Sequence, residues 1–158
     1  MAVETGKRFV DFKLQNQDGK TVTLGDFAGK WLVVYVYPKD DTPGCTIQGK
    51  SFTATKQEFD DAGIAVVGVS ADDVDSHKNF ANKFAFTIDL LADPNHELLD
   101  AAGVGQSDYK GTMYWDRTSF VIDPQGTLRK VYDKVDPNGH ERVLLDDIKA
   151  MQAKGATG

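Results

Sequence analysis

The sequence predicts an α/β fold in which a mixed central sheet is flanked by helices. Short apolar runs suited to buried strands alternate with segments of helical periodicity through the middle of the chain, as in parallel β-α-β units. Turn sequences at Asp18-Gly19 and Asp123-Pro124-Gln125-Gly126 join short strands, which indicates an antiparallel hairpin near each end. The chain has 158 residues, which suits a single domain over residues 1–158 with a sizeable core.

The first half of the chain predicts an N-terminal β-hairpin followed by the central strand and a long helix. The central strand is a continuous apolar run, and the helix after it begins at Pro43, behind the N-cap residue Thr42, and stops before Gly63. The predicted elements are strands 9–14 and 21–24, a helical turn within 25–30, strand 31–37 and helix 43–61.

The second half continues the alternation and ends in a second hairpin and a helix. The run over residues 64–70 is almost wholly apolar, which fits a parallel strand covered on both faces. The predicted elements are strand 64–70, helix 75–84, strand 88–91, a helix opened by Asp93-Pro94 that ends near Gly103, strands 118–122 and 127–132, and a helix from Asp136-Pro137 to about Lys154. This order is that of the thioredoxin-like architecture.

Composition and charge exclude several classes of function for this protein. Hydrophobic residues make up 41% and charged residues 27% of the chain, as in ordinary globular proteins. The net charge of −6 argues against general binding to nucleic acid or to anionic membranes. Residues 1–8 lack an apolar signal core and no apolar run is long enough to cross a bilayer. We therefore expect a cytoplasmic protein without membrane or nucleic-acid partners.

The chain has a single cysteine, Cys45. One thiol cannot form an internal disulfide, which suits a reducing compartment, and it cannot build a cysteine-based zinc site. The three histidines, His77, His96 and His140, lack ligand spacing and are expected on the surface. The acidic pairs at 40–41, 72–73 and 146–147 are typical of turns and helix surfaces. We expect no metal and no cofactor.

Cys45 falls at the third position of the predicted helix 43–61, in its first turn. Unpaired N–H groups and the positive end of the helix dipole favour a thiolate there. The dipole contributes only about 0.3–1 kcal/mol, so a cation and direct hydrogen bonds must add to it. Arg117, just before the apolar strand 118–122, is the candidate cation, and Lys39 and Lys50 are the local alternatives.

Three kinds of neighbour complete the predicted site. Thr42 lies three residues before the cysteine, so its hydroxyl can cap the helix or face a ligand beside the sulfur. Pro38 ends the central strand and has no N–H to donate, so it would exclude water. Three aromatic residues that precede Arg117 are candidates for the pocket mouth: Tyr109, Tyr114 and Trp115.

The pattern Pro38-x-x-x-Thr42-x-x-Cys45 resembles the active-site motif of the peroxiredoxins, and residues 37–46 most resemble their Q-type, or bacterioferritin-comigratory, branch. This resemblance implies that Cys45 attacks hydrogen peroxide or an organic hydroperoxide and becomes a sulfenic acid. It implies that Thr42 and the Cys45 N–H bind the peroxide while Arg117 stabilises the thiolate and the leaving oxygen. Gln48 matches a polar or acidic family position, so it is grouped with the substrate-binding residues and expected to hold Arg117.

Many members of this branch carry a second, resolving cysteine at the position that Lys50 holds here, and others carry it in the next helix. This chain has no cysteine at either place, since helix 75–84 also lacks one. A one-cysteine cycle follows, regenerated by an external thiol: thioredoxin, glutaredoxin or a low-molecular-weight thiol. The family resemblance favours a monomer or a weak dimer.

The main alternative to a peroxidase is a non-enzymatic thioredoxin-like module that binds partners or senses redox state through Cys45. Disulfide exchange is disfavoured because Cys-x-x-Cys is absent, and a cysteine hydrolase would need a histidine base.

Overall fold

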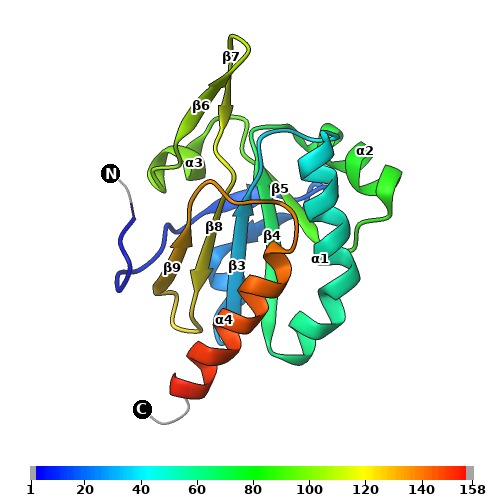
Figure 1. Cartoon of the computed structure of the whole chain (residues 1–158). Helices are drawn as coiled ribbons and strands as arrows, with labels where there is room; N and C mark the ends of the chain where they lie inside the picture. The colour runs from blue at the N-terminus through cyan, green and yellow to red at the C-terminus, as the bar shows by residue number, and fades with distance from the viewer. Residues whose placement is uncertain (1–2, 156–158) are drawn as a thin grey trace.

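The computed structural model describes residues 3–155 and confirms the predicted α/β fold with a mixed central sheet. Figure 1 shows the sheet with long helices packed on it. The elements are β1 (Lys13–Gln15), β2 (Thr21–Thr23), the 3-10 turn η1 (Leu24–Phe27), β3 (Trp31–Val36), α1 (Pro43–Asp61), β4 (Ile64–Ser70), α2 (Val74–Phe84), β5 (Asp89–Ala92), α3 (Glu97–Ala101), β6 (Gln106–Tyr109), β7 (Thr112–Trp115), β8 (Thr118–Ile122), β9 (Leu128–Tyr132) and α4 (His140–Gly155). No helix in this part of the chain is long and apolar enough to cross a membrane.

The main sheet has seven strands in the order β2-β1-β5-β4-β3-β8-β9. Strands β3, β4 and β5 are parallel, and β8 runs antiparallel on the other side of β3. All six residues of β3 are buried, so this strand lies between neighbours on both edges and layers on both faces. Its carboxyl end therefore opens at the middle of one sheet edge, where open α/β sheets usually carry their sites.

The core consists of two apolar clusters, one on each face of the sheet. Alternate residues of β3 point to opposite faces, so Leu32, Val34 and Val36 enter one cluster while Val33 and Tyr35 enter the other. The second cluster is covered by α1 and α4, through residues that include Phe52, Phe59, Leu144 and Ile148, and it contains Cys45. Figure 1 shows α1 and α4 side by side over this face.

Several predicted boundaries were wrong. The strand predicted at 9–14 is reduced to β1. The helix predicted to open at Asp93-Pro94 begins only at Glu97, although the Asp93 carboxylate still accepts the N–H groups of Glu97, Leu98 and Leu99 and so caps it. The last helix begins at His140 rather than after Pro137, because Gly139 has a positive φ of 78° that interrupts the helix.

The hairpin formed by β6 and β7 was not predicted. It forms a two-stranded sheet apart from the main one and projects from the body of the protein in Figure 1. Lys110 and Gly111 both have positive φ, the geometry of a tight hairpin turn. Tyr109, a candidate for the pocket mouth, is 64% exposed on this hairpin. Trp115 packs instead against the core cluster on the face opposite Cys45 and against the ring of His96.

The predicted surface placement of the histidines was wrong for His77 and His140, which are 0% and 7% exposed. The His140 ring, at the start of α4, packs against residues of both β8 and β9. Its Nε2 lies 2.9 Å from Ser119 Oγ, and its ring meets the Tyr132 ring edge-on. Burial lowers the pKa of His140 from 6.5 to about 4.

This lowered pKa predicts a specific loss of stability in acid. The unfolded chain takes up the His140 proton near pH 6.5, before the folded chain does, so stability is fully present above that pH and falls toward pH 4. The loss amounts to at most about 3 kcal/mol. Urea unfolding at pH 7, 5.5 and 4 should show a steeper acid decline for the wild type than for His140→Gln. Equal declines would contradict the prediction.

Candidate active site

Cys45 lies where the sequence placed it, in the first turn of the helix that follows β3. Thr42 has the extended backbone of an N-cap residue, Pro43 is the first helical residue, and the Thr46 N–H donates to the Thr42 carbonyl at 2.9 Å. The N–H groups of Gly44 and Cys45 precede this first helical bond and so have no intrahelical acceptor. Cys45 is 2% exposed, in the core cluster under α1.

The structure brings Arg117 to this sulfur. Arg117 directly precedes β8, and the antiparallel pairing of Val36 with Thr118 sets it beside the end of β3. Its Nη1 donates to Cys45 Sγ at 3.6 Å. The two lysine alternatives point elsewhere: Lys39 is exposed, and Lys50 Nζ lies 5.1 Å from the centre of the Phe84 ring.

Gln48 holds the same nitrogen of the guanidinium that contacts the sulfur. Its Oε1 accepts a hydrogen bond from Arg117 Nη1 at 2.7 Å, and the orientation of the amide is settled because a guanidinium only donates. Gln48 is 1% exposed, and its Nε2 has no hydrogen-bond partner among residues 3–155. The contact agrees with the expected part of Gln48 in holding Arg117.

Gly44 makes room for the same guanidinium. A Cβ atom at this position would lie 2.7 Å from Arg117 Nη2 and 3.5 Å from Pro137 Cγ. The guanidinium thus crosses the first turn of α1, with the loop before α4 next to it. In that loop, hydrogen bonds from Asn138 and the charge of Arg117 lower the pKa of Asp136.

Thr42 does not cap the helix with its side chain. Its hydroxyl donates to the Lys39 carbonyl at 2.9 Å, so the proton is committed and the oxygen lone pairs are left to accept from a ligand. Of the two roles considered for Thr42, this geometry favours the one toward a ligand. Pro38 is half-buried next to the carboxyl end of β3.

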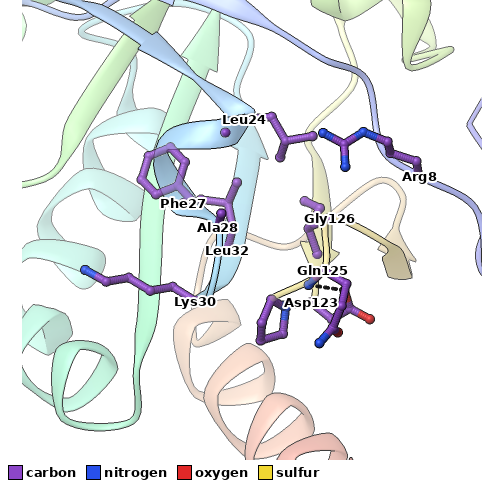
Figure 2. Close-up of a pocket in the computed structure, with 12 residues that line it drawn as sticks. Arg8, Leu24, Phe27, Ala28, Lys30, Leu32, Asp123, Gln125 and Gly126 are labelled. Atoms are coloured by element: carbon purple, nitrogen blue, oxygen red, sulfur yellow. Dashed lines mark hydrogen bonds between the residues drawn. The ribbon is translucent and has the colours of Figure 1, made fainter.

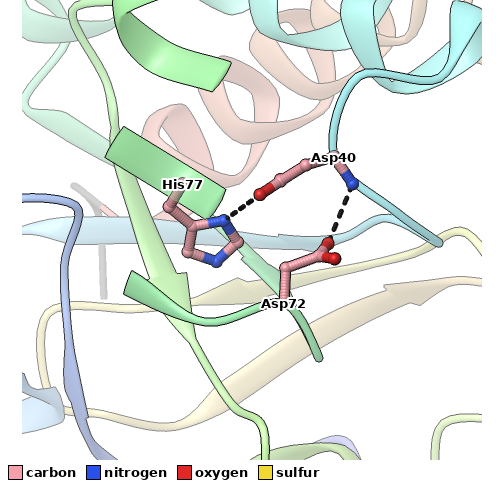
Figure 3. A group of neighbouring side chains, drawn as sticks. All are labelled: Asp40, Asp72 and His77. Atoms are coloured by element: carbon pink, nitrogen blue, oxygen red, sulfur yellow. Dashed lines mark hydrogen bonds and ion pairs between the residues drawn. The ribbon is translucent and has the colours of Figure 1, made fainter. Parts of the chain in front are cut away.

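Two buried features lie near the thiol: the first belongs to the predicted central strand, and the second carried no recognisable sequence signal. Tyr35 is fully buried, and burial, with the nearby charge of Cys45 second, raises its pKa well above its ordinary value. Asp40, expected in an exposed turn, is buried against His77. The candidate ligand atoms of Asp40, Asp72 and His77 lie within 4.8 Å of one another, as Figure 3 shows. These contacts link residues 32 to 37 positions apart, which a local motif cannot reveal.

A hollow elsewhere on the molecule is separate from the thiol. Figure 2 shows this pocket between η1 and the β8–β9 turn, lined by residues that include Arg8, Lys30, Leu32 and Asp123. Leu32 lies near the amino end of β3, whereas Cys45 follows the carboxyl end. The cavity volume of about 50 Å³ holds no more than a few water molecules.

Comparison with known proteins agrees with the geometry. Residues 5–131 match the AhpC/TSA family. Peroxiredoxin Bcp of Xanthomonas campestris is 39% identical over 143 residues, which cover 89% of this chain and 89% of that protein. Peroxiredoxin Bcp of Bacillus subtilis is 34% identical over 160 residues, which cover 98% of this chain and all of the relative. The chain belongs to the peroxiredoxins, in the Q-type or Bcp branch.

Solved structures of this branch have the same fold. The bacterioferritin comigratory protein of Xanthomonas campestris superposes with a TM-score of 0.86 at 35% identity, over 94% of this chain and 99% of that one. A mutant of PrxQ from Xylella fastidiosa gives a TM-score of 0.91 at 29% identity, over 96% and 99% of the two chains. The thioredoxin-like peroxiredoxin fold is therefore confirmed, and this peroxiredoxin is a thiol-dependent peroxidase.

The close approach at Gly44 generates a prediction. Gly44→Ala should push the Arg117 guanidinium away from Sγ, because a methyl group cannot occupy a position 2.7 Å from Nη2. Loss of one charge-assisted contact should slow alkylation of Cys45 by iodoacetamide at pH 7 roughly 10-fold. Gly25→Ala is the matched control, since the nearest atom to its added methyl lies 3.7 Å away. Equal alkylation rates in the two variants would refute the role of Gly44.

Proposed function

We propose that Cys45 is the peroxidatic residue of this enzyme and that it reduces both hydrogen peroxide and organic hydroperoxides. The contact between Arg117 Nη1 and Cys45 Sγ at a helix start carries the proposal, because it places a fixed positive charge on the nucleophile. The single chain 1–158 supplies the whole site. The Xanthomonas relative is described by its alkyl peroxide reduction activity, which supports the wider substrate class.

The reaction is a two-electron displacement on oxygen. The Cys45 thiolate attacks the terminal peroxide oxygen, an S–O bond forms, and the O–O bond breaks. The electron pair leaves on the far oxygen, which takes a proton from water and departs as water or an alcohol. The sulfur is oxidised to sulfenic acid while the peroxide is reduced.

The surrounding groups align and stabilise this displacement. The free lone pairs of Thr42 Oγ1 accept the peroxide O–H, and the Cys45 N–H donates to a peroxide oxygen. Arg117 stabilises the thiolate and then the charge that develops on the leaving oxygen, while Gln48 keeps it in place. Pro38 shields the sulfur from water and adds no competing N–H donor.

A one-cysteine cycle completes the turnover. No second cysteine exists in the chain, and Lys50 occupies the position of the common resolving residue with its ammonium over Phe84. An external thiolate therefore attacks the Cys45 sulfenic sulfur and expels hydroxide, and a second thiol releases Cys45 from the mixed disulfide. Thioredoxin, glutaredoxin or a low-molecular-weight thiol, plentiful in a reducing compartment such as the cytoplasm, would serve.

Stopped-flow peroxide reduction tests the catalytic assignments. Cys45→Ser should abolish peroxide consumption, and Arg117→Ala should lower the second-order rate constant roughly 10²–10³-fold by removing a charge-stabilising donor. Arg117→Lys should recover only part of the loss, because a lysine ammonium cannot reproduce the position from which Arg117 Nη1 donates to both Sγ and Gln48 Oε1.

The same measurement separates the enzyme from the redox-sensing module. A wild-type rate no faster than that of free cysteine would support the module and refute the peroxidase. A wild-type rate that is unchanged in Arg117→Ala would remove the guanidinium from the mechanism.

Intact-mass analysis tests the one-cysteine cycle. One equivalent of peroxide should add one oxygen atom to the wild-type chain, and a thiol should then replace it with a mixed disulfide on Cys45. Excess thiol should restore the starting mass. A sulfenic acid that no donor in a panel of protein and small thiols can reduce would contradict catalytic turnover. Cys45→Ser should show neither adduct.

A further inference from the structure

A buried carboxylate–imidazole pair lies behind the active-site turn. Asp40, in the turn between β3 and α1, places Oδ2 2.7 Å from Nδ1 of His77 on α2. The two side chains are 5% and 0% exposed. Figure 3 shows the Asp40 side chain pointing at the His77 ring while its backbone nitrogen faces Asp72.

The hydrogen-bond partners fix where the protons lie. His77 Nε2 is 2.9 Å from the Leu91 carbonyl, which can only accept, so Nε2 carries a hydrogen. One further proton must then lie between Nδ1 and the Asp40 carboxylate. The pair is therefore held together by a short, charge-assisted hydrogen bond out of contact with water.

Both carboxylate oxygens and the backbone N–H of Asp40 have hydrogen-bond partners. The Tyr37 hydroxyl donates to Oδ1 and the Ser76 hydroxyl to Oδ2, each at 2.7 Å, and the Asp40 N–H donates to Asp72 Oδ2 at 2.8 Å. Burial, with Asp40 second, raises the pKa of Tyr37 far above its ordinary value, which keeps the phenol protonated as a donor. Protein groups contact both carboxylate oxygens of Asp40 and both ring nitrogens of His77, so we interpret the cluster as a tether between the active-site turn and α2.

The tether reaches Thr42 through one peptide group. The Lys39 carbonyl and the Asp40 N–H belong to the same planar unit. Asp72 binds its N–H, and its carbonyl accepts the Thr42 hydroxyl at 2.9 Å. Since His77 holds the Asp40 side chain and Asp72 holds its backbone, the plane cannot rotate without breaking buried bonds. The direction of the Thr42 hydroxyl is set by Asp72, in the loop between β4 and α2, and by His77 on α2.

We propose that the Asp40–His77 pair, together with Asp72, positions the Thr42 hydroxyl for the peroxide, an inference that rests on the proposed peroxidase function. His77 acts through Asp40 and the 39–40 peptide and does not touch the substrate. Loss of the pair should misdirect Thr42 while leaving the Arg117–Cys45 contact intact, because that contact is built from β8 and α1.

Two reactions of Cys45 separate positioning from general disruption. His77→Phe and Asp72→Ala should each lower the second-order rate constant for hydrogen peroxide about 10- to 100-fold. Alkylation by iodoacetamide needs the thiolate but not Thr42, so its rate should stay within about 3-fold of wild type. Asp40→Asn should keep most of the wild-type rate of peroxide reduction, because the asparagine amide can donate to Nδ1 of neutral His77 and accept from the Tyr37 hydroxyl.

A double-mutant cycle tests the route through Thr42. If His77 acts by orienting that hydroxyl, adding His77→Phe to Thr42→Val should cost no further peroxide rate. Lys83→Ala is the matched control: it breaks the exposed Lys83–Asp41 ion pair, which joins the same turn to the same helix, and should change the peroxide rate less than about 3-fold.

The outcomes are distinguishable. Multiplicative losses in the cycle, or a folded His77→Phe with an unchanged peroxide rate, would overturn the positioning role while leaving the peroxidase intact. Parallel losses of oxidation and alkylation would show general disruption and also overturn it. A wild-type chain that consumes no peroxide would remove the proposed function and this inference with it. If His77→Phe does not fold, the partly exposed Asp72→Ala carries the same comparison.

Discussion

The antiparallel pairing of β8 with β3 is the constraint on which the site depends. Cys45 lies in the first turn of the helix that follows β3, but its cation comes from a residue 72 positions later. Only the register that sets Val36 opposite Thr118 puts Arg117 at the strand's carboxyl end. A slip of one residue would turn the β8 side chains to the other face and withdraw the guanidinium. The apolar residues that fix this register, on both faces of the sheet, therefore also assemble the chemistry.

The energetics require more than one source of stabilisation for a charged sulfur that is nearly buried. A helix start contributes about 0.3–1 kcal/mol, and a hydrogen bond to a charged group about 1.5–3 kcal/mol. Arg117 supplies the second kind of contact only if its guanidinium is held in place. The Gln48 side-chain oxygen holds Nη1, and the absence of a side chain at Gly44 leaves the room that the guanidinium occupies. The thiol and its cation thus form one packed unit.

Features that depend on neighbouring residues were easier to predict than features that depend on contacts between residues far apart in the sequence. The helix start at Pro43 and the position of Cys45 depend on neighbouring residues, and both were predicted correctly. Arg117 was inferred from its place at a strand boundary, and the family resemblance supported that choice. The burial of His77 was missed because nothing local distinguishes it from a surface histidine; its partner lies 37 residues away. The β6–β7 hairpin was missed because its mostly exposed strands lack an apolar face.

The site is built from two independently held halves. Arg117 and Gln48 form one half, braced by β8 and the loop before α4, and act on the sulfur. Thr42 belongs to the other, which is held through Asp40 by α2 and the loop between β4 and α2, and acts on the peroxide. Because Cys45 is only 2% exposed, this arrangement admits a small peroxide far more readily than the thiol of a protein reductant.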